Sequence, residues 1–301
     1  MAWKNFLISK PTKLSCKNNN LQIDNDEGKF NFPFNDLNSL MLENEAITIT
    51  KPLLCKLCEN NTLLYICDSQ HLPVGIMIPF DTNSNSLKVF NYQLEMKEPL
   101  KKRVWQEIVK TKLYNQNSVL IQNHIDEPMM KNLISNVKSG DIDNLEGRGA
   151  SLYFKRLFGK EFIREKDCVI NARLNYGYSI LRGAVARSLV YHGFYPTYGI
   201  HHHNHLNQFN LADDFIEPFR PAVDLIITKK LGILGDFERK DKIELYNLLN
   251  YDILIKEKLH SINNAIDICI GSFVKVISTS DISYLELPTL TNLQLHNYER
   301  E

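Results

Sequence analysis

The hydrophobic pattern of this 301-residue chain changes around residues 81–86, and this change constrains the fold most. Before it, segments such as 13–17 and 29–34 alternate apolar and polar residues, as half-buried strands do. Three asparagines at 18–20 predict a hairpin turn between two of these strands. One helix is predicted at about 52–59, where a proline stands in the tolerated first turn. The region up to residue 80 should therefore be β-rich with a single helix.

After this polar run, apolar residues recur at helical spacing. Val104, Trp105 and Ile108 fall on one side of a predicted helix, with lysines on the other. Helices are predicted at 100–112, 116–138, 146–158, 171–193, 211–229, 241–250 and 260–279. We therefore expect a two-domain α+β protein, with a β-rich domain at 1–80, a linker at 81–99 and an all-helical domain at 100–301.

Composition excludes few functions. The chain is 44% hydrophobic and 23% charged, as soluble globular proteins are. Its formal net charge of zero counts against free-standing DNA binding, but allows a local basic strip or a basic partner. The six cysteines are scattered, and the single Cys55–Cys58 pair lacks the second pair of a zinc site. No segment approaches the ~20 apolar residues of a membrane span. We expect a cytoplasmic protein that does not engage a membrane.

A histidine-rich turn followed by acids is the strongest chemical signal. Four of the nine histidines lie within residues 201–205, and Asp214 and Glu217 follow. Imidazole and carboxylate together bind the divalent metals that hydrolytic and phosphoryl-transfer sites use. Three residues apart, the two acids would share one helix face. The alternative is a solvated loop and a wet acidic surface. The surrounding apolar residues, Leu211 and Phe215 among them, favour a cation or partner instead.

Further charged residues have two interpretations each. Glu146 begins a predicted helix, where it either complements the helix dipole or reaches the same metal site as a third ligand. Arg182 and Arg187 either meet phosphates or are solvated or ion-paired. Two basic strips are candidates for DNA backbone contact, or else simply solvated faces: Lys97, Lys101, Lys102, Arg103, Lys110 and Lys112, and then Lys155, Arg156, Lys160, Arg164 and Lys166.

Four blocks in order resemble the CRISPR-associated integrase family, the first of the two universal Cas proteins of spacer acquisition, in its type II branch. They are residues 146–154, 171–178, the turn at 199–202, and 207–221. The resemblance covers nearly the whole chain. It implies an N-terminal β-domain that dimerises, a helical catalytic domain, and two dimers flanking a dimer of the second, smaller Cas protein. It also implies partnership with an accessory ring protein that binds DNA ends and with the RNA-guided effector nuclease.

The resemblance also implies the site and the reaction. The family's metal ligands fall on Glu146, His202 and Glu217, with Asp214 as a neighbouring ligand, and the metal is Mg²⁺ or Mn²⁺. The implied reaction joins the 3′-hydroxyl ends of a short DNA fragment (the protospacer) into the leader-proximal repeat by phosphodiester transesterification. Candidate contacts to DNA phosphates are Arg148, Tyr176, Arg182, Arg187, Arg220, Lys101, Lys102 and Arg103. The alternatives are a general metal-dependent nuclease on branched or broken DNA, a DNA-binding scaffold, and a metal-storage protein.

Overall fold

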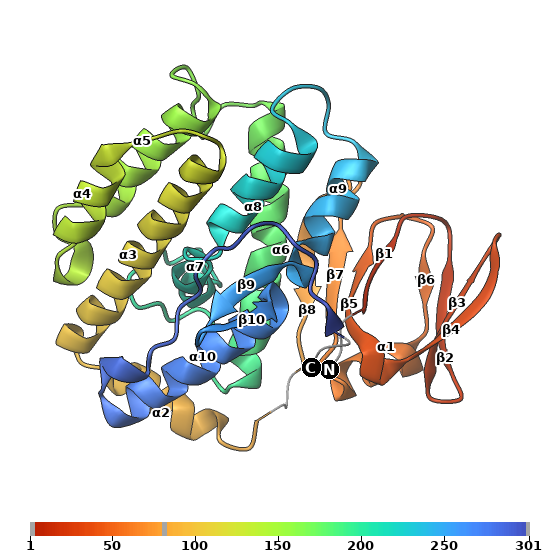
Figure 1. Cartoon of the computed structure of the whole chain (residues 1–301). Coiled ribbons are helices and arrows are strands. Elements are labelled where there is room, and N and C mark those ends of the chain that lie inside the picture. Colours follow the sequence, from red (N-terminus) through yellow and green to blue (C-terminus); the bar gives the residue numbers. More distant parts are fainter. Residues whose placement is uncertain (1–3, 80–82, 299–301) are drawn as a thin grey trace. The chain divides into compact units, whose positions relative to one another are not determined.

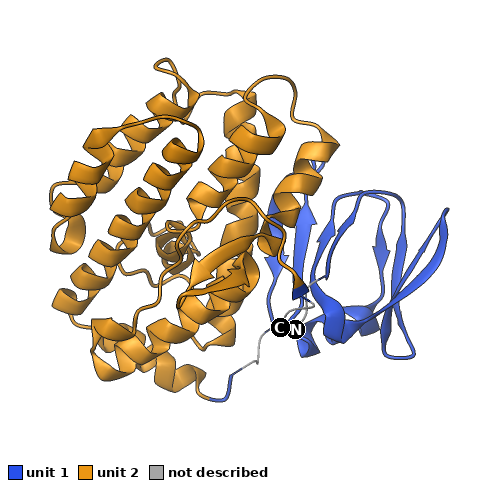
Figure 2. Cartoon of the chain, viewed as in Figure 1, with its two compact units in different colours: residues 1–84, 298–301 blue, residues 85–297 orange. Residues whose placement is uncertain are grey.

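The computed structural model describes residues 4–79 and 83–298. The chain divides into two compact units, residues 1–84 with 298–301, and residues 85–297 (Figures 1 and 2). Strands dominate the first unit and helices the second, which confirms the predicted α+β class. Residues 81 and 82 of the predicted linker lie outside the described residues. The rest of that segment contains helix α2 (Ser86–Glu95), where we expected none.

The first unit contains two four-stranded sheets and helix α1. One sheet has the strand order β1-β5-β7-β8 and the other β4-β3-β2-β6. The helix begins at Lys51 with proline in its first turn, as predicted. Buried residues from both sheets and the helix form one core, in which Leu14, Leu40 and Leu53 are fully buried. The elements are β1 (Lys4–Ile8), β2 (Lys13–Lys17), β3 (Asn20–Asn25), β4 (Gly28–Pro33), β5 (Leu37–Leu42), β6 (Thr48–Ile49), α1 (Lys51–Glu59), β7 (Leu63–Cys67) and β8 (Pro73–Met77).

The predicted asparagine turn joins β2 and β3. Asn18 and Asn19 both have positive φ, 50° and 58°, as a two-residue hairpin turn requires. The strands pair antiparallel from Lys17 opposite Asn20 to Lys13 opposite Asp24. Asparagine tolerates the left-handed region better than most residues, so the hairpin prediction is confirmed for its stated reason.

The second unit is built around two long helices. Helix α3 packs against α4, α5 and α8, and α6 packs against α7, α8 and α10 (Figure 1). Regular elements of this unit are α2, α3 (Glu98–Gln122), α4 (Pro128–Asn136), α5 (Leu145–Phe158), α6 (Val169–Tyr191), α7 (Asn210–Ile216), α8 (Arg220–Ile226), α9 (Arg239–Tyr246), β9 (Asp252–Ile255), β10 (Lys258–Ser261) and α10 (Ile262–Thr279). This arrangement places α3, the start of α5 and the α7–α8 junction side by side.

Helix α3 corrects two predicted boundaries. It continues without interruption through residues 113–115, which separate the predicted helices at 100–112 and 116–138, and the next helix begins only at Pro128. The polar run Asn115, Gln116 and Asn117 within this helix is buried. The side chain of Asn115 donates to the carbonyls of Pro218 and Pro288 and accepts from the Leu290 amide. Tertiary hydrogen bonds therefore satisfy the Asn115 side chain in the interior of this unit.

A β-hairpin corrects the prediction that this unit is all-helical. Strands β9 and β10 pair antiparallel, from Ile255 opposite Lys258 to Asp252 opposite Ser261. The two turn residues are Lys256 and Glu257, and both have positive φ. Neither residue type is typical of a two-residue turn, so the sequence carries no hairpin signal here.

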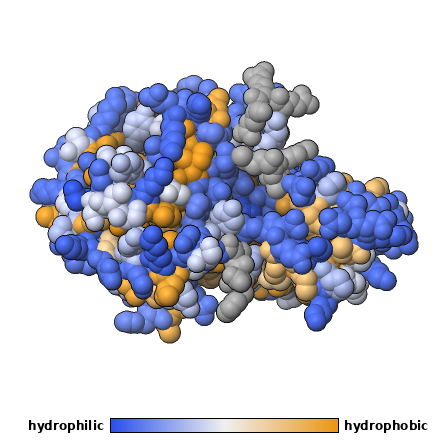
Figure 3. Space-filling model, turned by 90° about the horizontal axis from the view of Figure 1, so that it is seen from below, coloured by the Kyte–Doolittle hydropathy of each residue, from blue (hydrophilic) through white to orange (hydrophobic). Residues whose placement is uncertain are grey.

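The surface in the view of Figure 3 is largely hydrophilic, with apolar side chains in separate groups. None of the helices in the described part of the chain is both long and apolar enough to cross a membrane.

Candidate active site

A buried lysine links two of the predicted metal ligands. Lys112 on α3 lies in the helical unit with its side chain 5% exposed. Its ammonium nitrogen forms ion pairs with Glu146 Oε1 and, at 2.5 Å, with Glu217 Oε2. Glu146 comes from the start of α5, and Glu217 follows the last residue of α7. Two acids that are 71 residues apart in sequence thus share one cation.

Glu146 is positioned by the cap of its own helix. Asp141 accepts hydrogen bonds from the amides of Leu145 and Glu146, at 2.8 and 2.9 Å, and Asn144 accepts from Gly147. These bonds satisfy the free amides of the first turn. Glu146 therefore stands in the first helical turn and also shares Lys112 with Glu217, and its role as a metal ligand stays a prediction.

Glu217 is held by charge and by its backbone. Its Oε1 lies 3.2 Å from Nη2 of Arg220, and its Oε2 lies beside Lys112. The next carbonyl, that of Pro218, accepts a hydrogen bond from the buried Asn115 side chain at 2.8 Å. The polar face of α3 thus fixes both the carboxylate and the backbone at the α7–α8 junction.

Asp214 organises the histidine turn. Its carboxylate accepts from the backbone amides of Ile200, His201 and His202 at 2.5 to 3.1 Å. It also accepts from Nδ1 of His202 at 2.7 Å; we assign the proton to Nδ1 because a carboxylate only accepts. Nε2 of His202 is then the nitrogen left for a further ligand. A histidine fixed by a carboxylate in this way is the usual arrangement behind a metal-binding imidazole.

The turn is too tight for a side chain at position 199. A Cβ on Gly199 would lie 2.3 Å from the His202 carbonyl oxygen and 3.0 Å from Asp214 Oδ2. On the other side, the ring of His201 stacks on Trp105 of α3, with centroids 4.1 Å apart and planes within 3°. His202 meets the same indole edge-on. Stacking on Trp105 and hydrogen bonds to Asp214 thus hold the backbone and rings of the turn in place.

The charges of the site act on one another. Burial alone would raise the pKa of Glu217, but Arg220 and Lys112 outweigh it and the pKa falls. Burial likewise opposes the charge of Lys112, yet Glu217 and Glu146 raise its pKa. The hydrogen bond to Asp214, with a smaller contribution from Glu217, raises the pKa of His202. Both Glu217 and Lys112 are therefore charged, and the charge of Glu217 favours the protonated form of His202.

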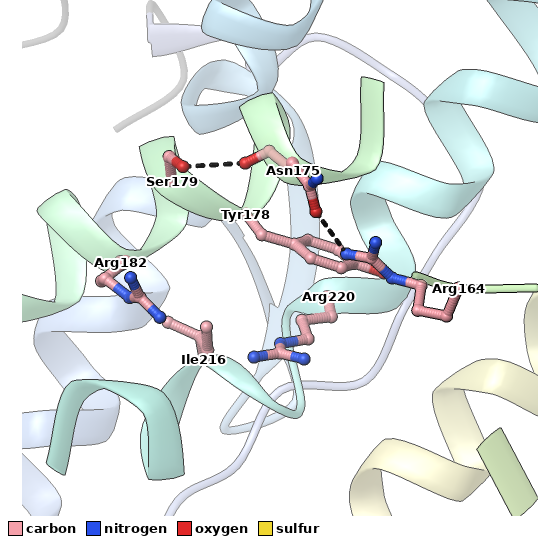
Figure 4. A pocket seen from close by; sticks show the side chains of 7 residues that line it. All are labelled: Arg164, Asn175, Tyr178, Ser179, Arg182, Ile216 and Arg220. Carbon is pink, nitrogen blue, oxygen red and sulfur yellow. Dashed lines mark hydrogen bonds between the residues drawn. The ribbon is translucent and has the colours of Figure 1, made fainter. Parts of the chain in front are cut away.

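Figure 4 shows a pocket lined by arginines, one of which, Arg220, pairs with Glu217. It has a volume of about 290 Å³ and is lined by Arg164, Asn175, Tyr178, Ser179, Arg182, Ile216 and Arg220. The guanidinium groups of Arg220 and Arg164 lie 4.9 and 5.4 Å from the centre of the Tyr178 ring. Arg182 pairs with Asp213 at 2.7 Å. Planar guanidinium groups in such a cavity suit phosphate oxygens.

A buried carboxylate bonds one of the residues that line this pocket. Asp224 on α8 accepts hydrogen bonds from the hydroxyls of Tyr178, at 2.6 Å, and Tyr153, at 2.8 Å. Burial raises the pKa of Asp224 to about 6, although the two hydroxyl bonds partly oppose the shift. Because this pKa is raised, the folded chain binds a proton that the unfolded chain does not, between about pH 4 and pH 6. Stability from this group is therefore present at low pH and is lost as pH rises through 6.

We expect Asp224→Asn to remove that pH dependence. From pH 4.5 to pH 7.5 the wild type should lose about 2 kcal/mol of unfolding free energy through Asp224. The variant should not lose this amount, so its stability relative to wild type should rise by about 2 kcal/mol over that range. Urea unfolding followed by Trp105 fluorescence measures it, in a Trp3→Phe background. Asp213→Asn, with the same change in charge, is the control. A difference that does not vary with pH would contradict the shifted pKa.

The structure does not bring all predicted contact residues to the site. Tyr176 is buried and packs against Phe237. Arg187 is buried and bonds Asn263 between α6 and α10. Arg148 is exposed on α5 and lines a different pocket. Lys102 and Arg103 are exposed on α3, whereas Lys101 pairs with Glu98. Of the predicted phosphate contacts, Arg182 and Arg220 line the arginine pocket, and Arg164 of the second basic strip lines it as well.

Lys112 requires a correction. We placed it in an exposed basic strip, but it is buried between two acids. A signal was available: Lys112 falls in line with Trp105, Ile108 and Val109 on the apolar side of the helix. Trp105 and Asp141 were also not predicted as parts of the site. Nothing in their local sequence marks a stacking ring or a helix cap as functional.

The donor groups are of the types that bind a divalent metal, but their present positions are not close enough to hold one. In residues 4–79 and 83–298, no three histidine, cysteine, aspartate or glutamate side chains are grouped closely enough to hold an ion. Glu217 Oε2 is buried and receives no hydrogen bond of regular geometry, although the ammonium lies 2.5 Å away. A buried carboxylate oxygen needs a compensating cation, and Lys112 supplies one here. Two carboxylates and an oriented imidazole are a suitable ligand set for Mg²⁺ or Mn²⁺.

The fold is that of a two-unit α+β protein with a buried carboxylate–histidine site in its helical unit. A family model described as "CRISPR associated protein Cas1" matches residues 6–252. A CRISPR-associated endonuclease Cas1 of Neisseria meningitidis serogroup C (strain 8013) is 38% identical over 304 residues, which cover 99% of this chain and all of the relative. This chain belongs to the Cas1 family.

Solved structures share the fold. A casposase bound to integration product is 20% identical, with a TM-score of 0.74 and coverage of 93% of this chain and 92% of that one. A chain in a Cas6-RT-Cas1–Cas2 complex is also 20% identical, with a TM-score of 0.70. The matched region covers 97% of this chain and 36% of that longer chain. At these identities the likeness establishes the fold.

Proposed function

We propose that this chain is a metal-dependent DNA integrase and endonuclease. It joins the 3′-hydroxyl ends of short DNA fragments into a CRISPR repeat by phosphodiester transesterification. The Glu146–Glu217 pair on Lys112 and the oriented His202, in a chain of the Cas1 family, carry the proposal. The Neisseria relative is named an endonuclease, and one structural neighbour is a casposase bound to integration product. Those names support both cutting and joining for this chain.

Glu146, His202 and Glu217 would hold Mg²⁺ or Mn²⁺, and the imidazole favours Mn²⁺. The bound ion would polarise a phosphodiester of the repeat and activate the attacking hydroxyl. The chain's own groups position the DNA. Arg164, Arg182 and Arg220 bind its phosphates in the arginine pocket, and Arg220 also orients Glu217. Lys102 and Arg103 add backbone contacts that weaken with salt.

The chain acts in an assembly. We propose a homodimer that binds the second, smaller Cas protein, since a structural neighbour belongs to a Cas1–Cas2 complex. The zero net charge means that basic partner surfaces supply part of the DNA affinity. The accessory ring protein that binds DNA ends and the RNA-guided effector nuclease are further proposed partners, and the cytoplasm is the proposed location.

Strand transfer tests the function directly. The purified chain and its small partner are mixed with a short duplex bearing 3′-hydroxyls, a supercoiled plasmid carrying leader and repeat, and Mn²⁺ or Mg²⁺. We expect joined product that depends on the metal. Nicking without joining would instead establish the general nuclease, and DNA binding without either reaction would establish a scaffold. A plasmid lacking the repeat is the control for target choice.

A further inference from the structure

The ammonium of Lys112 lies where a metal ion shared by Glu146 and Glu217 would lie. It contacts one oxygen of each acid, and the lysine side chain is almost fully buried. Arg220 takes the other oxygen of Glu217. Both oxygens of Glu217 therefore face cations before any divalent ion arrives. The chain therefore contains the proposed ligands, but the ammonium of Lys112 lies on the two carboxylates that would bind the metal.

Charge explains why a lysine stands there. Without a cation, the buried Glu217 and the partly buried Glu146 would lose hydration and would repel each other. A metal ion bonds carboxylate oxygen at about 2.1 Å, closer than the 2.5 Å of the ammonium contact with Glu217. Two cations cannot approach the same oxygen from the same side at these distances, and they also repel each other. Metal binding and the present position of Lys112 therefore exclude each other.

Lys112 and Arg220 differ in their freedom to move. Arg220 lies over the Tyr178 ring and is held on two sides. Lysine is a point charge on a flexible four-carbon stem. The side chain that yields to an arriving ion is therefore Lys112.

Resting on the proposed metal-dependent function, we propose that Lys112 is a resident cation that exchanges with the divalent metal. In the metal-free chain it holds the Glu146–Glu217 pair together and stabilises the fold. On metal binding it leaves the carboxylates, so it lowers the affinity of the site for metal. The residue acts through the two acids and is a positioning residue.

Lys112→Met tests the exchange, because methionine keeps an unbranched chain without the charge. In EDTA we expect its Tm to fall by about 6 °C or more, since the two acids lose the cation that they share. Calorimetric titration with Mn²⁺ should give a Kd about tenfold lower than that of wild type, the size of an ordinary coupling between two sites. Mn²⁺ should also raise the Tm of the variant more than that of wild type.

Two variants serve as controls. Lys110→Met makes the same change on the same helix at a partly exposed residue that pairs with Glu107, so Tm and Kd should stay at wild-type values. Lys112→Arg keeps the charge and should retain weak Mn²⁺ binding. If Lys112→Met is too unstable to titrate, Glu146→Gln in the same chain removes the facing charge. The double variant should then regain Tm in EDTA.

The outcomes separate the two proposals. An unchanged or higher Kd in Lys112→Met, with wild-type binding that requires Glu217, would overturn the exchange and leave the metal site intact. No Mn²⁺ binding in wild type would overturn both. Loss of Tm without a gain in affinity would make Lys112 a structural ion pair only.

Discussion

Replacing Glu217 with glutamine should lower the rate of DNA joining by about 10³-fold or more. Glutamine keeps the shape of the side chain but removes the charge that faces Lys112 and Arg220. A ligand of the proposed metal is lost, and metal assistance contributes several kcal/mol to such reactions. The measurement is the initial rate of joined product in the strand-transfer assay, with Mn²⁺ and with Mg²⁺.

Stability must be separated from chemistry in this experiment. Glu217→Gln also leaves two buried cations with less compensation, so its Tm should fall as well. The assay therefore runs well below that Tm, with circular dichroism to confirm the fold. Glu107 is a partly exposed acid that pairs with Lys110 on α3, so Glu107→Gln is the matched control and should keep full activity. A folded Glu217→Gln protein that joins DNA at more than a tenth of the wild-type rate would refute the assigned role.

The sequence predicts local structure well where a pattern is complete within a few residues. The asparagine turn and helix α1 follow from such short signals. It predicts poorly where distant residues decide the outcome. The polar run around Asn115 continues a helix because its side chain bonds carbonyls more than 100 residues away. The Lys256–Glu257 turn adopts positive φ without glycine or asparagine.

The same limit applies to the site. Residue types mark Glu146, His202 and Glu217 as candidates, but no spacing in the sequence reveals that Lys112 joins two of them. Helical spacing predicts one shared face for Asp214 and Glu217. The turn after α7 instead directs Glu217 to Lys112, while Asp214 faces the histidine turn. Burial and direction of a charged side chain depend on tertiary packing, so only the structure separates their roles.

Asp214 can be tested as an orienting residue rather than a metal ligand. Its four accepted hydrogen bonds go to residues 200–202. Asp214→Asn should therefore lower Mn²⁺ affinity by about 10- to 100-fold, the usual cost of losing the group that orients a histidine ligand. The same calorimetric titration measures it. Asp213→Asn, one residue earlier and paired with Arg182, is the matched control and should leave the affinity unchanged.

A double variant decides how Asp214 acts. If it acts only through His202, then Asp214→Asn should cost no further Mn²⁺ affinity in a His202→Ala chain, because the group it orients is already gone. If Asp214 binds the ion directly, as the sequence resemblance implies, the two losses should add. Residual binding in His202→Ala must be measurable, so the titration uses Mn²⁺, the ion that an imidazole ligand favours over Mg²⁺. Additive losses would place Asp214 among the ligands. Non-additive losses would make the histidine turn, held by one carboxylate, the unit that presents Nε2 to the metal.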